Sequence, residues 1–163
     1  MRLRFSRLFW LPVCAFVCAS GLSSPSRADD QSARTARVQH VVDELKSRLD
    51  IPQTVTVLVV ERNPLMASVA RDPESPASFV ASFEADFLDR LSDDELAAAV
   101  AHELGHVWIF THFPFLQTEQ LANEIAMRVV SRDSLVPVYA QVFERIRVAA
   151  DVDTFLGEPH RDH

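Results

Sequence analysis

The stretch SDDELAAAVAHELGHVWIF spans residues 92–110 and predicts a central helix with a capped start. Ser92 and Glu95 form a capping box, in which the serine side chain accepts from the backbone N–H of Glu95 and the glutamate accepts from that of Ser92. The residues that follow are apolar on almost every side, which is typical of a helix buried in a core. Pro114 prevents a straight continuation of this helix.

The segment HELGH, residues 102–106, fits the metal-binding pattern H-E-x-x-H. His102 and His106 lie one helical turn apart and about 40° apart around the axis, so both rings can reach one ion. Glu103 lies beside them and can take a proton from a zinc-bound water. Burying these groups without partners is costly, so we expect a Zn²⁺ site rather than two core histidines bonded to carbonyls.

A catalytic zinc site needs a third protein ligand, for which the sequence offers His112 and Glu119. His112 has the spacing of the extended pattern H-E-x-x-H-x-x-G-x-x-H, but Ile109 stands where that pattern has a turn glycine. A β-branched residue is a severe outlier at positive φ, and in a continuous helix position 112 lies about 240° around the axis from His106. Glu119 opens the next helix, which a helical hairpin would return to the motif, and Asn123 one turn later can hydrogen-bond a ligating histidine. We therefore expect Glu119 to be the third ligand, with His112 as the alternative.

The rest of the chain predicts an α+β fold with a small mixed or antiparallel sheet. Strand candidates follow one another at residues 53–61, 65–70 and 78–83. Helices are expected at residues 32–49, 118–131 and 134–150, in addition to the motif helix. Residues 151–163 are expected to form a flexible tail.

Residues 1–28 have the three parts of a secretory signal peptide. Three arginines precede an apolar stretch at residues 8–19, and Ser26-Arg27-Ala28 offers small residues at the positions that a signal peptidase recognises. We expect cleavage before Asp29 and an exported protein, periplasmic or secreted. An uncleaved membrane anchor is the alternative.

Removal of the signal peptide leaves an acidic chain without cysteine. Its four arginines leave 12 of the 16 Lys and Arg residues against 23 Asp and Glu residues, a net charge of about −11. This balance argues against nucleic-acid partners. Both cysteines lie in the signal, so the mature domain must be held by its core and by any bound metal rather than by a disulfide.

The segment FLDRLSDDELAAAVAHELGHV, residues 87–107, resembles the active-site region of the HtpX and CAAX-prenyl-protease type of zinc metallopeptidase. The third ligand of that family lies in an E-x-x-A-D motif on a later helix, which corresponds here to Glu119, Ala122 and Asn123. Asn123 replaces the usual Asp, and only twelve residues separate His106 from Glu119. This short spacing is more similar to that of the ImmA/IrrE type of peptidase.

The resemblance implies a minimal zincin-like domain at residues 29–150, with the active-site helix and C-terminal helices beside the sheet. It implies a zinc-dependent endopeptidase in which His102, His106 and Glu119 hold Zn²⁺ and Glu103 activates the water. The implied partner is a polypeptide substrate, such as an unfolded or membrane-associated protein, which would pair with an edge strand at 65–70 or 78–83. Tyr139 and His112 are candidate donors to the carbonyl oxygen by chemistry alone. The alternative function is an exported, catalytically silent zincin-fold protein that acts as a binding or regulatory scaffold.

Overall fold

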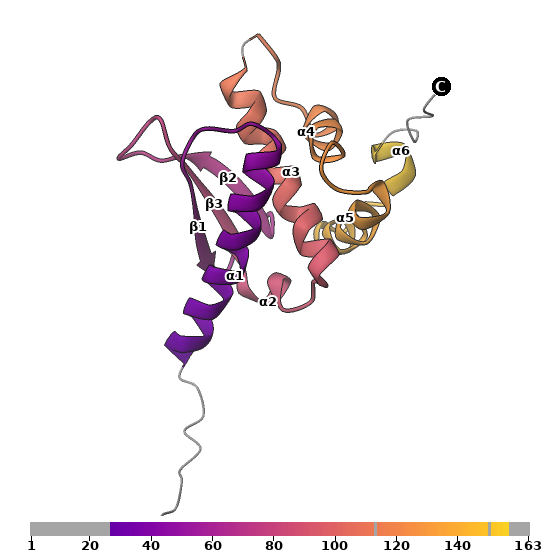
Figure 1. The fold of residues 1–163 in the computed structure, drawn as a ribbon. Coiled ribbons are helices and arrows are strands. Elements are labelled where there is room, and N and C mark those ends of the chain that lie inside the picture. Colours follow the sequence, from indigo (N-terminus) through magenta and orange to yellow (C-terminus); the bar gives the residue numbers. More distant parts are fainter. Residues whose placement is uncertain (1–26, 113, 150, 157–163) are drawn as a thin grey trace, which may run out of the picture.

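The computed structural model describes residues 27–112, 114–149 and 151–156. Three strands and six helices follow one another in these ranges (Figure 1). The helices are α1 (Arg27–Arg48), α2 (Ala85–Leu88), α3 (Asp93–Thr111), α4 (Glu119–Ala126), α5 (Arg132–Ile146) and α6 (Val152–Leu156). The strands are β1 (Val55–Val60), β2 (Ala67–Arg71) and β3 (Phe79–Glu84). The chain is therefore α+β, as the sequence predicts.

The sheet is mixed, with the strand order β1-β3-β2. β1 runs parallel to β3, with Val57 opposite Ala81, and β2 runs antiparallel to β3, with Val69 opposite the same alanine. Because β3 is the central strand, residues 78–83 do not form an exposed edge, which corrects one of the two expected docking strands. β2 is left as the edge strand on the side of α3.

Helices α1 and α3 pack side by side against the sheet, α1 over β1 and α3 over β2 (Figure 1). Alternate residues of β1 and β3 point toward them, since Val55, Val57, Val59, Phe79, Ala81 and Phe83 are all buried. Burial of such apolar side chains stabilises the fold by about 1.5–3 kcal/mol for each large side chain. Helix α3 is itself buried along most of its length, from Leu96 to Ile109.

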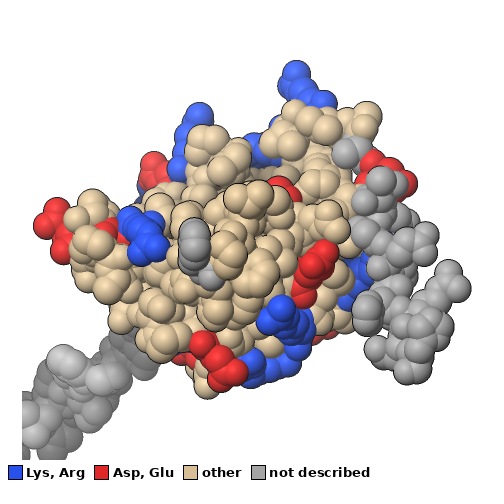
Figure 2. All heavy atoms as spheres, turned by 90° about the horizontal axis from the view of Figure 1, so that it is seen from above, with Lys and Arg blue, Asp and Glu red and all other residues tan. Residues whose placement is uncertain are grey.

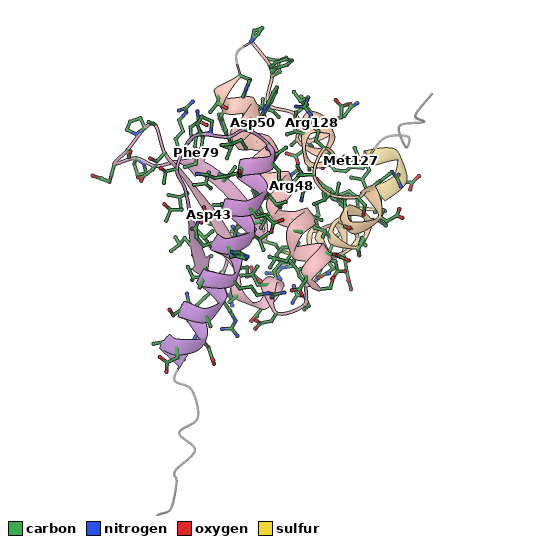
Figure 3. All side chains as sticks on the ribbon, in the orientation of Figure 1. Asp43, Arg48, Asp50, Phe79, Met127 and Arg128 are labelled. Atoms are coloured by element: carbon green, nitrogen blue, oxygen red, sulfur yellow. The ribbon has the colours of Figure 1, made fainter. Side chains whose placement is uncertain are left out.

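Helix α1 ends in a Schellman motif rather than at the proline that follows it. The N–H of Ile51 donates to the carbonyl of Lys46 at 2.9 Å, and Asp50 between them has φ of 54°. Aspartate is one of the few residues other than glycine that enter this left-handed region readily. Arg48, in the last turn, donates to the carbonyl of Val129 at 2.8 Å and so connects α1 to the segment that follows α4 (Figure 3).

Residues 151–163 are expected from the sequence to form a flexible tail, but the first of them form a short helix. Val152–Leu156 form α6, where Leu156 is buried and the ring of Phe155 packs against those of Tyr139 and Phe143 on α5. Aromatic clustering of this kind holds a helix too short to be stable by itself. Residues 157–163 lie outside the described residues.

The predicted signal peptide lies almost wholly outside the described residues. Of residues 1–28, only Arg27 and Ala28 are described, and they form the first residues of α1. Among the helices of the described part of the chain, none combines the length and the apolar character needed to cross a membrane.

Candidate metal centre

The capping box predicted for α3 is present and fixes where the motif helix begins. The backbone N–H of Glu95 donates to Ser92 Oγ at 3.3 Å, and that of Ser92 donates to Glu95 Oε2 at 2.7 Å. From this start α3 runs through the whole motif without a break. His102 and His106 therefore project from one side of the helix, with their Nε2 atoms 3.2 Å apart.

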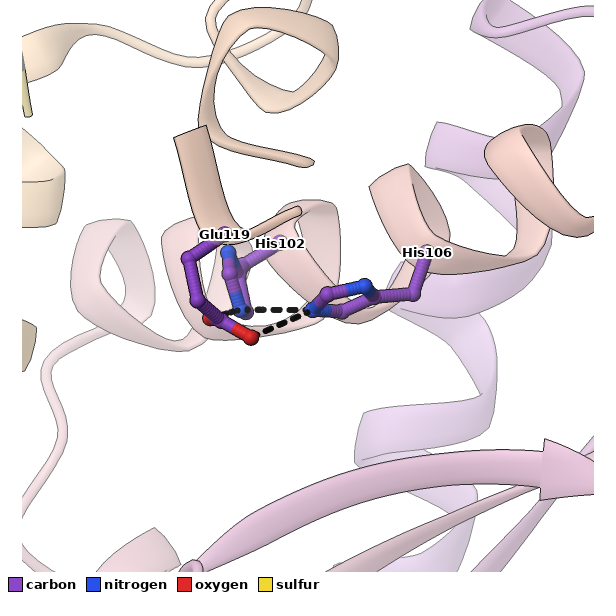
Figure 4. Close-up of side chains that lie close together, drawn as sticks. All are labelled: His102, His106 and Glu119. Carbon is purple, nitrogen blue, oxygen red and sulfur yellow. Dashed lines mark hydrogen bonds and ion pairs between the residues drawn. The ribbon is translucent and has the colours of Figure 1, made fainter. Parts of the chain in front are cut away.

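Glu119 is the first residue of α4 and comes back to these two rings (Figure 4). Its Oε2 lies 3.2 Å from His102 Nε2, and its Oε1 lies 3.5 Å from His106 Nε2. Thr118 caps α4 by accepting from the N–H of Leu121 at 3.1 Å, which sets the point at which the glutamate leaves the backbone. His102, His106 and Glu119 are thus brought together in one cluster.

The closest approaches between the three side chains are similar to the distances between zinc ligands. Ligand atoms about 2.0–2.1 Å from a tetrahedral zinc ion are about 3.3–3.4 Å from one another. The shortest distances between the three side chains here are 3.2–3.5 Å, with Glu119 Oε2 nearest to His102 Nε2 and Glu119 Oε1 nearest to His106 Nε2. Two imidazoles and one carboxylate are also the donor set of a catalytic zinc site with one open position.

The alternative ligand, His112, lies outside this cluster. α3 continues through Ile109 to Thr111, and His112 is its C-cap. The ring of His112 stacks on that of Trp108 with centroids 3.8 Å apart, and its Nδ1 bonds the carbonyl of Trp108 at 2.7 Å. The side chain therefore belongs to the turn between α3 and α4.

The outer nitrogen of His102 is held by two side chains from other helices. Its Nδ1 lies 2.9 Å from Asn123 Oδ1, the contact expected from the sequence, and 2.9 Å from the hydroxyl of Tyr139. Tyr139 itself donates to Asn123 Oδ1 at 2.7 Å, and its burial raises the pKa of the phenol. If Nε2 binds a metal, Nδ1 carries the hydrogen and donates to the asparagine oxygen, which fixes the orientation of the ring.

His106 has a partner that the sequence analysis missed. Gln117 Oε1 lies 3.0 Å from His106 Nδ1, and Gln117 Nε2 donates to the backbone carbonyl of His106 at 3.1 Å. Gln117 precedes the N-cap of α4 in an irregular segment. A lone glutamine in a loop carries no recognisable motif, so only the path of the returning chain reveals this contact.

Glu103 is only 6 % exposed and lines the same cavity as the cluster. Burial raises the pKa of its carboxyl group, and the neighbouring histidines oppose that effect. Glu119 behaves in the opposite way, because hydrogen bonds with His102 and His106 hold its pKa far below the usual range. The pKa values of Glu103 and Glu119 are therefore shifted in opposite directions. Such perturbed pKa values are common in catalytic centres.

The helices that carry the cluster approach each other at Gly105. A Cβ atom built on this residue would lie 2.4 Å from the backbone oxygen of Ala122 and 2.9 Å from its Cα. The missing side chain of Gly105 thus lets α4 lie directly on α3. Glu119 and Asn123 are on the same helix as Ala122, one on either side of it, so this contact sets their distance from His102.

A cavity of about 550 Å³ opens beside the cluster. Its floor is α3, and its walls are the edge strand β2, α5 and the single turn of α6. Most of its lining is apolar, including Leu65, Val69, Phe87, Phe110, Val138, Val142, Phe143, Ile146 and Phe155. The charged groups of the described lining are Glu103 and Glu119, together with the histidines of the motif.

A two-histidine motif on a buried helix, a glutamate from the following helix and a small mixed sheet define the class of zincin-type metallopeptidases. The model of peptidase family M48 matches residues 32–149, and the chain belongs to this family of zinc metallopeptidases. The family assignment agrees with the resemblance found in residues 87–107.

Two individual proteins show the extent of this similarity. A "Protease HtpX homolog" from Salinibacter ruber is 28 % identical over 99 residues, which cover 61 % of this chain and 33 % of the relative. This chain therefore spans about a third of the length of that relative. The crystal structure of the metallopeptidase zymogen abylysin from Pyrococcus abyssi superposes with a TM-score of 0.49 at 14 % identity, over 68 % of this chain and 96 % of that chain.

Proposed function

We propose that this protein is an exported zinc-dependent endopeptidase. His102, His106 and Glu119 would hold the ion, and Glu103 would act as the general base. The observation that carries the proposal is the convergence of three zinc-binding side chains, with closest approaches of 3.2–3.5 Å, beside a buried glutamate in one cavity. The N-terminal sequence supports export, with residues 1–28 as signal peptide and residues 29–150 as the peptidase domain.

Glu103 provides the proton chemistry. Bound zinc supplies a Lewis acid, which lowers the pKa of a bound water and polarises a carbonyl group. The buried carboxylate of Glu103 accepts a proton from the attacking water and then donates it to the amine that leaves. Burial raises the pKa of Glu103, which makes its carboxylate a stronger base toward the attacking water.

The edge strand β2 offers a place for an extended substrate. Ala67, Ser68 and Val69 of this strand line the cavity, and the outer edge of β2 faces away from β3. An added peptide strand would hydrogen-bond to this edge and so lie along α3, past the metal cluster. This arrangement supports cleavage within a polypeptide chain.

The surroundings of the cavity favour apolar substrate segments. Leu65, Phe110 and Ile146 line the cavity although they are exposed, and Phe115 and Leu116 are exposed in the turn just before Gln117. Figure 2, which views the molecule from above the orientation of Figure 1, shows that residues other than Lys, Arg, Asp and Glu make up most of that face. Contiguous exposed apolar surface marks sites of interaction with other chains. We therefore propose that the substrates are unfolded or membrane-derived polypeptides, which expose such segments.

The test compares the wild type with Glu103→Gln on reduced, alkylated casein. We expect cleavage by the wild type and a loss of at least about 100-fold in kcat/KM for the variant. Zinc content is expected to stay the same, because Glu103 is not one of the three donors. Glu124→Gln, which alters an exposed carboxylate on α4, is the control and is expected to retain full activity. If the zinc-loaded wild type cleaves nothing, the endopeptidase proposal fails and the scaffold alternative is favoured.

A further inference from the structure

Gln117 contacts His106 with both ends of its side-chain amide, and the chemistry of the two contacts fixes how each group is oriented. The backbone carbonyl of His106 can only accept a hydrogen bond, so the end of the amide 3.1 Å from it must be the NH₂ group. The amide oxygen then faces His106 Nδ1 at 3.0 Å. That nitrogen must therefore carry a hydrogen, so in the neutral ring it is Nε2, which faces His102 and Glu119, that is unprotonated.

Asn123, the partner of His102, is used differently. Its Oδ1 accepts from His102 Nδ1 at 2.9 Å and from the hydroxyl of Tyr139 at 2.7 Å. Its Nδ2 is fully buried and has no hydrogen-bond partner among the described residues. Only the oxygen of this amide forms hydrogen bonds within the described structure. A buried NH₂ group without a partner lowers the stability of the folded protein by about 1–3 kcal/mol.

We propose that Gln117 is a positioning residue that sets the tautomer and orientation of His106, and that it must be an amide whereas Asn123 need not be. The inference rests on the proposed zinc site. A glutamate at position 117 would place a carboxylate oxygen against the carbonyl of His106, where no hydrogen is available to bond the two acceptors. An aspartate at position 123 would replace the unpaired NH₂ group, and its hydrogen bond with His102 would be charge-assisted and stronger.

The two carboxylate substitutions therefore have opposite effects on zinc binding. Gln117→Glu loses the anchor on the backbone, and Gln117→Ala loses both contacts, so each is expected to weaken zinc binding by about 10–100-fold. Asn123→Asp is expected to bind zinc at least as tightly as the wild type. Its added negative charge is offset only while zinc is bound, so the metal-free Asn123→Asp variant is expected to be less stable than the metal-free wild type and to gain more stability on binding zinc. Gln120→Ala removes an exposed glutamine that bonds only Glu124 in the described structure, and it serves as the matched control.

The experiment is a competition of the full chain with a chromophoric chelator for zinc. The result that overturns the proposal is a Gln117→Glu variant that binds zinc as tightly as the wild type, or a Gln117→Ala variant within twofold of it. If the wild type itself binds no zinc, the proposed zinc site fails, and a second measurement tests Gln117 separately. In ¹H–¹⁵N spectra of the imidazole rings, the Nδ1–H of His106 is expected to exchange slowly in the wild type and in Gln120→Ala. It is expected to exchange much faster in Gln117→Ala, and equal rates would also overturn the proposal. Gln117 is exposed, so its replacement leaves the core intact.

Discussion

Gly105→Ala tests whether the close approach of α3 and α4 holds the third ligand in place. The added methyl group would lie 2.4 Å from the carbonyl oxygen of Ala122, where an ordinary contact is at least 3.4 Å, so α4 must retreat by about 1 Å. Zinc sites tolerate changes of about 0.2 Å in their ligand distances. A retreat of this size would carry Glu119 away from the histidines, so we expect zinc binding to be lost or severely weakened.

Gly105→Ala is expected to have only a small effect on the free energy of unfolding of the metal-free protein. Overpacking costs about 1–3 kcal/mol, whereas alanine in place of glycine in a helix interior stabilises by about 1 kcal/mol. The free energy of unfolding of the metal-free variant is therefore expected to lie within about 2 kcal/mol of that of the metal-free wild type.

The assay pairs zinc titration with urea unfolding of the metal-free protein. Ala122→Gly in the Gly105→Ala background is not expected to restore zinc binding, because the contacting atoms belong to the backbone. Wild-type zinc affinity in Gly105→Ala would refute the view that this contact positions Glu119.

Two further substitutions test the elements around the site. Ser92→Ala removes the capping box with Glu95 and is expected to lower the free energy of unfolding by about 0.5–2 kcal/mol, measured by thermal unfolding, with little effect on KM. Glu84→Gln alters a buried carboxylate whose pKa is lowered by the backbone N–H of Asn63 and by the guanidinium of Arg145, 2.9 Å away. A folded pKa below the unfolded value gives stability that is present above about pH 4.5 and is lost as the pH falls. We expect the free energy of unfolding of Glu84→Gln to be about 1–3 kcal/mol lower than that of the wild type at pH 7. This difference between the two proteins is expected to narrow below about pH 4. An equal difference at pH 7 and below about pH 4 would contradict a stabilising role of the ionised Glu84.

The local features of the site could be predicted because each depends on residues close in sequence. The capping box at Ser92 and the helical spacing of the motif need only one turn of helix to be recognised. The prediction made from Ile109 is also confirmed, since α3 continues through this residue and His112 lies at the C-cap of the helix. The return of Glu119 followed from the proline in the connection and the small residues on the next helix.

The pairing of the strands could not be predicted with equal certainty. A parallel β1–β3 pair with β2 at the edge depends on contacts between distant segments, and the sequence left both a mixed and an antiparallel sheet open. Helix ends were also misplaced where tertiary contacts or backbone geometry intervene. α5 ends at Ile146 rather than residue 150, because Arg147 adopts φ of 55°, and α4 ends at Ala126 rather than residue 131. Helix termini are set by such local geometry more than by apolar periodicity.

The zinc content of the purified mature domain tests the proposed metal centre most directly. After loading and removal of excess metal, we expect one zinc ion per chain in the wild type and in His112→Ala, and loss of zinc in Glu119→Ala. Markedly less than one zinc per chain in the wild type would contradict the metal centre. Retention of zinc by Glu119→Ala together with its loss in His112→Ala would show that the third ligand has been assigned to the wrong residue.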